Sequence, residues 1–134
     1  MKNNYKFKVN DYAKSMFYLE EINDIWIKKC SKYLKYIFGK KIKNSVIVDY
    51  AFGRGNWSLA FKKLGAKEII AIDKSIHNVN KFKKYLKKNK ITNINVIEGD
   101  ILKTKIKSKV DIFWVYGIFH HIKNINKLIF NIKK

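Results

Sequence analysis

The sequence predicts an α/β protein built on a parallel sheet, and two observations indicate this class. Short apolar runs at 46–50, 69–73, 93–98 and 110–116 alternate with segments of helical periodicity. Runs that are apolar at nearly every position are typical of parallel strands covered on both faces. Acids lie at or just after the ends of the first three runs, so we expect polar chemistry along one edge of the sheet.

Length and composition restrict the class of protein further. A chain of 134 residues is long enough for one domain with a core. No apolar run approaches the ~20 residues that cross a bilayer, and the lysine-bearing segment 1–10 is unlike a secretory signal. Cys30 is the one cysteine, which excludes an intramolecular disulfide. We therefore expect a cytoplasmic protein with no membrane partner.

The formal net charge of +20 has two interpretations. Lysines that neutralise phosphates would form a nucleic-acid surface. However, Arg54 is the one arginine among the 30 basic residues, and readers of bases and phosphates tend to use the planar fork of arginine. The alternative is a solvated coat of lysines, and the sequence leaves both open.

The N-terminal segment 1–44 is predicted to be helical. Asp11 is a plausible N-cap and Gly39 a plausible stop, with one helix or two between them. Such a segment is either a packing helix or a lid over a pocket. The expected apolar stripe consists of Tyr12, Met16, Leu19, Ile22, Trp26, Cys30, Tyr33 or Leu34, and Ile37.

Three further helices are expected between and after the strands. The first covers 57–64 and ends at Gly65. Ser75 is placed to cap the second, and the third covers 124–132. The buried stripe of the second helix is expected to consist of Ile76, Val79, Phe82 and Leu86.

The loop after the first strand has the features of a ligand-binding turn. Asp49 ends the apolar run, and Gly53 and Gly55 follow it just before a helix start. Glycine adopts positive φ and has no Cβ, so backbone can approach a ligand closely there. A Gly-x-Gly turn can also be a plain connection, so this pattern alone does not define a site.

Two more acids occupy comparable places, Asp73 after the second strand and Asp100 after the third. A carboxylate at such a place can accept hydrogen bonds from ribose hydroxyls or from an exocyclic amine. Each acid by itself is more often a solvated charge or a helix cap than a ligand-binding group. Three of them in register with a glycine loop indicate a nucleoside ligand.

These motifs together resemble the class I S-adenosylmethionine-dependent methyltransferases, over about residues 45–122. The segment 49–55, Asp-Tyr-Ala-Phe-Gly-Arg-Gly, is similar to that family's first motif. Asp73 matches the acid that holds the ribose, and Gly99-Asp100-Ile101 the segment that holds the adenine. The run 110–121 matches the fourth strand and the loop that faces the methyl group.

The resemblance implies a Rossmann-like parallel sheet of strand order 3-2-1-4 in a domain over 45–134, which binds S-adenosyl-L-methionine and transfers its methyl group. It also implies that Asp49 supports the loop and the amino group of the methionine part. The cofactor-binding residues implied are Asp49, Ala51, Gly53, Gly55, Asn56, Asp73, Lys74, Asp100, Ile101 and Tyr116.

Two local features qualify this resemblance. Ala51 stands where the family usually has its first glycine, so we expect weakened cofactor binding, more so if its φ is positive. The rival ligand, a dinucleotide, requires a third glycine where this chain has Ser58. That disfavours NAD.

The sequence assigns no catalytic residue and no metal site. His120 and His121 follow the fourth strand, and either is a candidate base only if the acceptor is protonated. Tyr116 is placed to line the methyl channel or to pack. Cys30, on an apolar helix face, is expected in the core rather than as a nucleophile. The acceptor is not readable, and a small molecule is favoured over RNA because no separate RNA-binding module is visible.

The family's sheet has seven strands, whereas this chain supplies four. We therefore expect a truncated methyltransferase or half of a split one, in which the fourth strand is an apolar edge open to a partner chain or to self-association. The alternative is a non-catalytic remnant, or a basic nucleic-acid-binding module, that retains the fold.

Overall fold

The computed structural model describes residues 22–133. The predicted helical residues Asp11, Tyr12, Met16 and Leu19 lie outside this range. The elements are α2 (Asp24–Phe38), the 3-10 turn η1 (Gly39–Ile42), β1 (Val46–Tyr50), α3 (Asn56–Lys63), β2 (Glu68–Asp73), α4 (Ile76–Lys88), β3 (Ile94–Glu98), β4 (Ile112–Val115), the 3-10 turn η2 (Phe119–His121) and α5 (Ile125–Lys133). None of the described helices is long and apolar enough to cross a bilayer.

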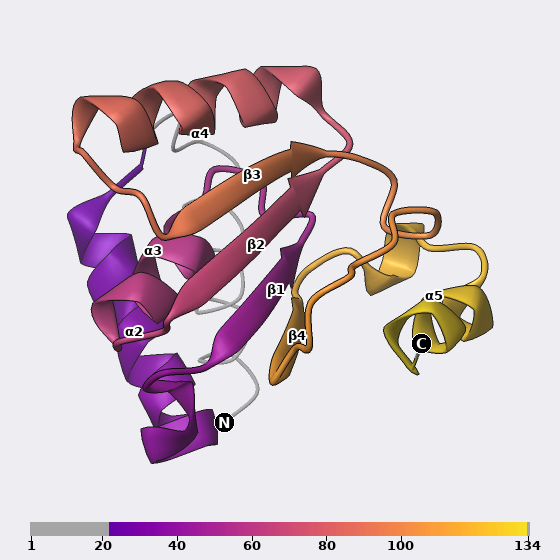
Figure 1. Ribbon diagram of the computed structural model, residues 1–134, viewed down its shortest axis with the longest axis horizontal. Helices are drawn as coiled ribbons and strands as arrows, with labels where there is room; N and C mark the ends of the chain where they lie inside the picture. The colour runs from indigo at the N-terminus through magenta and orange to yellow at the C-terminus, as the bar shows by residue number, and fades with distance from the viewer. Residues whose placement is uncertain (1–21, 134) are drawn as a thin grey trace, which may run out of the picture.

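The four strands form one parallel sheet in the order β3-β2-β1-β4. This confirms the predicted order 3-2-1-4. Asp49 of β1 lies opposite Ala71, and Asp73 of β2 lies opposite Glu98. The carboxyl ends of the first three strands therefore meet at one edge of the sheet (Figure 1).

Helices cover both faces of the sheet, as its nearly continuous apolar strands predicted. On one face α2, α3 and α4 pack with Ile47 and Ile69 in a single cluster. On the other, Val48 and Ile72 pack with Leu128 of α5 and with apolar residues of the segment after β3. Figure 1 shows α5 across the sheet from α2 and α3. The alternation follows from the two-residue period of a strand.

Helix α2 begins and ends at recognisable caps. The Asn23 side chain accepts hydrogen bonds from two backbone N–H groups of the first turn, and Gly39 ends the helix with φ 56°. The predicted stop at Gly39 is confirmed. Of the expected stripe, Cys30 and Leu34 are buried, whereas Ile37 is exposed and that part of the prediction is wrong. Ile27, which the expected stripe leaves out, is buried instead, so the buried face of the helix is displaced from the expected one.

Two other sequence expectations need correction. Ile76, in the first turn of α4, is exposed, and the buried face of this helix begins at Val79. The fourth strand is shorter than the predicted 110–116. Just before the strand, the N–H of Asp111 donates to the Val46 carbonyl, and the Asp111 carboxylate accepts the N–H of Val46. The side chain of Asp111 thus takes the place of a backbone partner from β4. At its end, Gly117 turns the chain with φ 76°.

Gly55 is required by two independent features of the fold. Its φ is 94°, which side chains rarely adopt, and it precedes α3 as the N-cap residue. A Cβ on Gly55 would also collide with the ring of Phe82 from α4. By contrast, Gly53 has φ 61° with nothing within 4 Å of the position of a Cβ.

We therefore expect Gly55→Ala to lower the free energy of unfolding by about 2–5 kcal/mol, from backbone strain together with overpacking against Phe82. Gly53→Ala, the matched control, meets only the strain and should lose about 1–2 kcal/mol. Urea denaturation of the two variants measures the difference. Equal losses would show that Phe82 does not restrict this position.

Candidate functional site

The three predicted acids lie at the same edge of the sheet. Asp49 is in β1, Asp73 ends β2, and Asp100 follows β3 by two residues. Asp49 and Asp73 are also on the same face, since each follows a residue of the α2–α4 cluster by two positions. The prediction that these acids lie along one edge of the sheet is confirmed.

The loop 51–55 after β1 is held against the end of β2. The N–H of Ala51 donates to the Ile72 carbonyl at 2.6 Å, and the N–H of Gly53 donates to Oδ2 of Asp73 at 2.8 Å. Ala51 has φ 55°, a left-handed conformation that costs an alanine more than a glycine. The positive φ on which the expected weakening of cofactor binding depends is therefore present at Ala51. The weakening itself stays a prediction.

Asp73 is almost completely buried, and its carboxylate is shared between the loop and α4. Besides Gly53, the N–H of Ser75 donates to Oδ1 at 2.8 Å and Nδ2 of Asn78 approaches Oδ2 at 3.4 Å. A carboxylate has about four acceptor positions. Among the described residues, these three donors leave one acceptor position, on Oδ1, unused.

Asp49 is a buried carboxyl with one short hydrogen bond. Oγ of Ser58 donates to its Oδ2 at 2.6 Å. Burial raises the pKa of Asp49 from 3.8 to about 7, and the nearby charge of Asp73 adds to this rise while the Ser58 bond opposes it. Near neutral pH the group is therefore poised between its charged and neutral forms.

The remaining predicted site residues have mixed positions. Asp100 is partly buried and accepts the Leu102 N–H at 2.9 Å through Oδ1, whereas Ile101 is buried in the α5-side cluster. The side chain of Lys74 is exposed. The side-chain oxygen of Asn56 accepts the N–H of Asn23 at 3.2 Å, so it faces the start of α2.

Tyr116 belongs to an aromatic cluster at the end of β4. Its ring centroid is 4.8 Å from that of Trp57 and 5.9 Å from that of Trp114, onto which it stacks. Trp57 and Trp114 are 4.9 Å apart, and the ring of Tyr33 meets Trp57 edge-on. Partial burial raises the pKa of Tyr116. These rings form an aromatic cluster at the start of α3, in which only Trp114 and Tyr116 are parallel.

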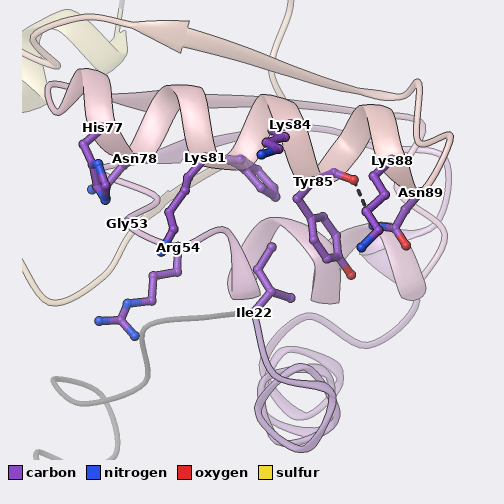
Figure 2. A pocket seen from close by; sticks show the side chains of 11 residues that line it. Ile22, Gly53, Arg54, His77, Asn78, Lys81, Lys84, Tyr85, Lys88 and Asn89 are labelled. Atoms are coloured by element: carbon purple, nitrogen blue, oxygen red, sulfur yellow. Dashed lines mark hydrogen bonds between the residues drawn. The ribbon is translucent and has the colours of Figure 1, made fainter.

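An open hollow of about 770 Å³ lies on the other side of the glycine loop, along α4. Figure 2 shows side chains of α4 directed toward this space, with Tyr85 pointing toward Ile22. Its described lining contains no acid. The lining residues are Ile22, Gly53, Arg54, His77, Asn78, Lys81, Phe82, Lys84, Tyr85, Lys88 and Asn89.

Other candidates for chemistry are placed plainly by the structure. Cys30 is in the core, and burial raises its pKa to about 12, so the thiol stays protonated. His120 and His121 are exposed, with their rings 3.9 Å apart. Within residues 22–133 no three His, Cys, Asp or Glu side chains gather as metal ligands.

Sequence reasoning missed three polar or aromatic participants. Ser58 was considered only as the absence of a glycine, although a serine nine positions after an acid and just inside a helix can reach back to it. Asn78 stands three residues after the Ser75 cap, where its N–H bonds the cap and its amide reaches Asp73. Trp57 carried no signal beyond helical periodicity.

Comparison with known proteins agrees with this geometry. The family model described as "Methyltransferase domain" matches residues 47–134. The chain therefore belongs to the methyltransferase domain family, as its motifs indicated. No curated protein gives a significant match.

Solved structures show the same fold. YcgJ protein of Bacillus subtilis superposes with a TM-score of 0.69 at 16% identity, over 80% of this chain and 45% of that one. A SAM-dependent methyltransferase of Aquifex aeolicus gives 0.65 at 21%, over 77% and 56%. Coclaurine N-methyltransferase, bound to N-methylheliamine and SAH, gives 0.68 at 20%, over 80% and 31%. The chain thus spans about half or less of these proteins.

The raised pKa of Asp49 predicts a pH-dependent stability. Between 3.8 and about 7 the folded protein keeps a proton that the unfolded chain releases. The contribution is therefore complete below pH 3.8 and is lost as the pH rises through about 7, a fall of at most about 4 kcal/mol at 1.36 kcal/mol per pKa unit.

Asp49→Asn keeps the shape of the side chain without this titration, so its free energy of unfolding should fall less between pH 4 and 8. Urea denaturation across that range compares it with the parent chain. Parallel pH profiles for the two proteins would show that Asp49 ionises normally in the folded state.

Proposed function

We propose that this chain is the cofactor-binding part of an S-adenosylmethionine-dependent methyltransferase. The observation that carries the proposal is the approach of the Gly53 N–H to the Asp73 carboxylate at the ends of β1 and β2. It puts the backbone of a glycine next to a carboxylate on which the described residues leave one acceptor position unused. Membership of the methyltransferase domain family supports this proposal.

The residues present fit such a cofactor. The space beside Gly53 is open where a side chain would stand, so the backbone there can contact a ligand closely. Asp73 would accept from the ribose hydroxyls, and Asp100 with Ile101 would contact the adenine. Asp49 would support the loop from below, and Tyr116 would line the side where a methyl group is presented.

The sulfonium centre of the bound cofactor supplies an activated methyl group. What the chain contributes is alignment and exclusion of water. The packed rings of Trp57, Trp114 and Tyr116, which are partly buried, would exclude water on the β4 side of a bound cofactor. No described residue is assigned as a base, in keeping with the sequence analysis.

The acceptor and the partner chain are part of the proposal. The sequence favours a small molecule over RNA as acceptor. We also propose that β4, which pairs only with β1 among the described strands, takes up a further strand from a partner chain or a second copy. The exposed apolar residues Ile125 and Ile129 of α5 support a contact on that side.

Isothermal titration calorimetry with S-adenosylmethionine and S-adenosylhomocysteine tests the cofactor site. Asp73→Asn removes the charge that accepts the ribose hydroxyls, so affinity should fall about 10- to 100-fold, the range for hydrogen bonds to charged groups. Asp24→Asn, an exposed acid in the first turn of α2, is the control and should bind as the parent does.

If Asp73→Asn keeps full affinity while retaining the parent circular dichroism spectrum, Asp73 is not a cofactor ligand. A parent chain that binds neither compound would favour the alternative, a non-catalytic remnant that retains the fold.

Hydrogen exchange at two protein concentrations tests the free edge. If copies pair at β4, its amides should exchange more slowly at the higher concentration. The other edge strand, β3, is the internal control and should be unaffected. A chain that stays monomeric in sedimentation, with β4 protected equally at both concentrations, contradicts a second copy at this edge.

A further inference from the structure

The hollow along α4 has a charge pattern that the cofactor site does not explain. Lys81, Lys84 and Lys88 follow one another at spacings of three and four, so they share one face of the helix. His77 begins the same row, one turn before Lys81. The row from His77 to Lys88 extends over roughly 16 Å at the helical rise per residue.

The hollow also offers an aromatic surface. Tyr85 lies between Lys84 and Lys88 in sequence, is partly buried, and points into the space toward Ile22 (Figure 2). The hydrogen bond that Asn89 donates to the Tyr85 carbonyl at 2.9 Å ties the side chain of Asn89 to the last turn. A row of cations beside an aromatic ring is the combination that binds single-stranded nucleic acid, because lysines contact the phosphates and a base stacks on the ring.

The position of the hollow connects it with the cofactor loop. Gly53 and Arg54 form one end of it, and Gly53 is the residue that donates to Asp73. A strand that lies along α4 would therefore reach the loop where the cofactor is proposed to bind. The chain has many other lysines, as its net charge of +20 shows. This row is distinguished from them by its place beside the hollow and the cofactor loop.

We propose that the hollow along α4 binds a single-stranded nucleic acid through Lys84, Lys88 and Tyr85. The binding itself does not rest on the cofactor site proposed above. Use of the strand as the methyl acceptor does rest on that site, and the strand would then take the place of the small molecule that the sequence favours. The length of the row favours a chain of phosphates over a single phosphate ion. The competing explanation is the solvated lysine coat considered for the sequence.

The same helix provides a matched control for this proposal. Lys83 and Lys87 are exposed, carry the same charge on the same helix, and do not line the hollow. Lys84→Ala/Lys88→Ala and Lys83→Ala/Lys87→Ala therefore remove equal charge from the two faces of α4. A third variant, Tyr85→Leu, removes the stacking ring and no charge.

Fluorescence anisotropy with a labelled oligouridine of about 12 nucleotides, within the range of single-strand sites, measures affinity at several salt concentrations. For Lys84→Ala/Lys88→Ala we expect roughly tenfold weaker binding and a slope of log K against log salt reduced by about 1.4, since each lost contact to a single strand contributes about 0.7. The control pair should change affinity less than twofold. Tyr85→Leu should weaken binding without changing the slope.

Equal effects of the two lysine pairs, or no binding by the parent chain, would overturn the proposal in favour of a diffuse lysine coat. So would poly-glutamate that binds as tightly as RNA, because it has the charge without bases. Oligodeoxythymidine distinguishes RNA from single-stranded DNA as the ligand. Equal affinity for the two indicates a general single-strand site, and weaker affinity for the deoxy strand indicates contacts to the 2′-hydroxyl. Both results agree with the proposal. Calorimetry with S-adenosylhomocysteine on Lys84→Ala/Lys88→Ala should be unchanged, so that a failure of the cofactor proposal is seen separately.

Discussion

The carboxylate and backbone of Asp73 are the contacts on which this edge of the molecule depends. Its side chain accepts from Gly53 of the loop after β1 and from Ser75 at the start of α4, and its carbonyl accepts the Gly99 N–H at 3.0 Å after β3. One residue thus joins the ends of three strands and the start of a helix. A buried carboxylate is tolerated there because backbone N–H groups satisfy it.

Beneath this junction Asp49 occupies a less favourable environment. Its carboxyl accepts a short bond from Oγ of Ser58, and Asp73 lies close enough for the two charges to repel. Burial is the main cause of the raised pKa of Asp49, and the charge of Asp73 adds to it. Burial likewise raises the pKa of Cys30 in α2, and the charge of Asp49 adds to that rise. Burial and the charge of Asp73 therefore disfavour the ionised form of Asp49, and the bond from Ser58 offsets this only in part. Such perturbed groups cluster at functional sites more often than elsewhere.

The loop divides the edge into two different surfaces. On one side, Trp57, Trp114 and Tyr116 present packed aromatic faces. On the other side, the lysine row of α4 borders an open hollow. A ligand at Gly53 would have an apolar wall toward β4 and a cationic channel toward α4. The aromatic side is therefore where we propose that the methyl group is aligned, and the cationic side is where we propose that a nucleic acid strand binds.

The sequence by itself determined the parallel sheet, the glycine loop and the acids at its edge, because strand apolarity and Gly-x-Gly spacing are local patterns. The strand order came from the family resemblance. Only the tertiary structure decided which partners those acids have: Ser58 and Asn78 reach them across turns that no local period encodes. It also decided that Ile37 and Ile76 are exposed, since helical periodicity predicts a face and not how much of it a neighbour covers. The row of lysines was visible in the sequence as charge. Its position beside a hollow and the cofactor loop depends on how α4 packs, through Phe82, against Gly55.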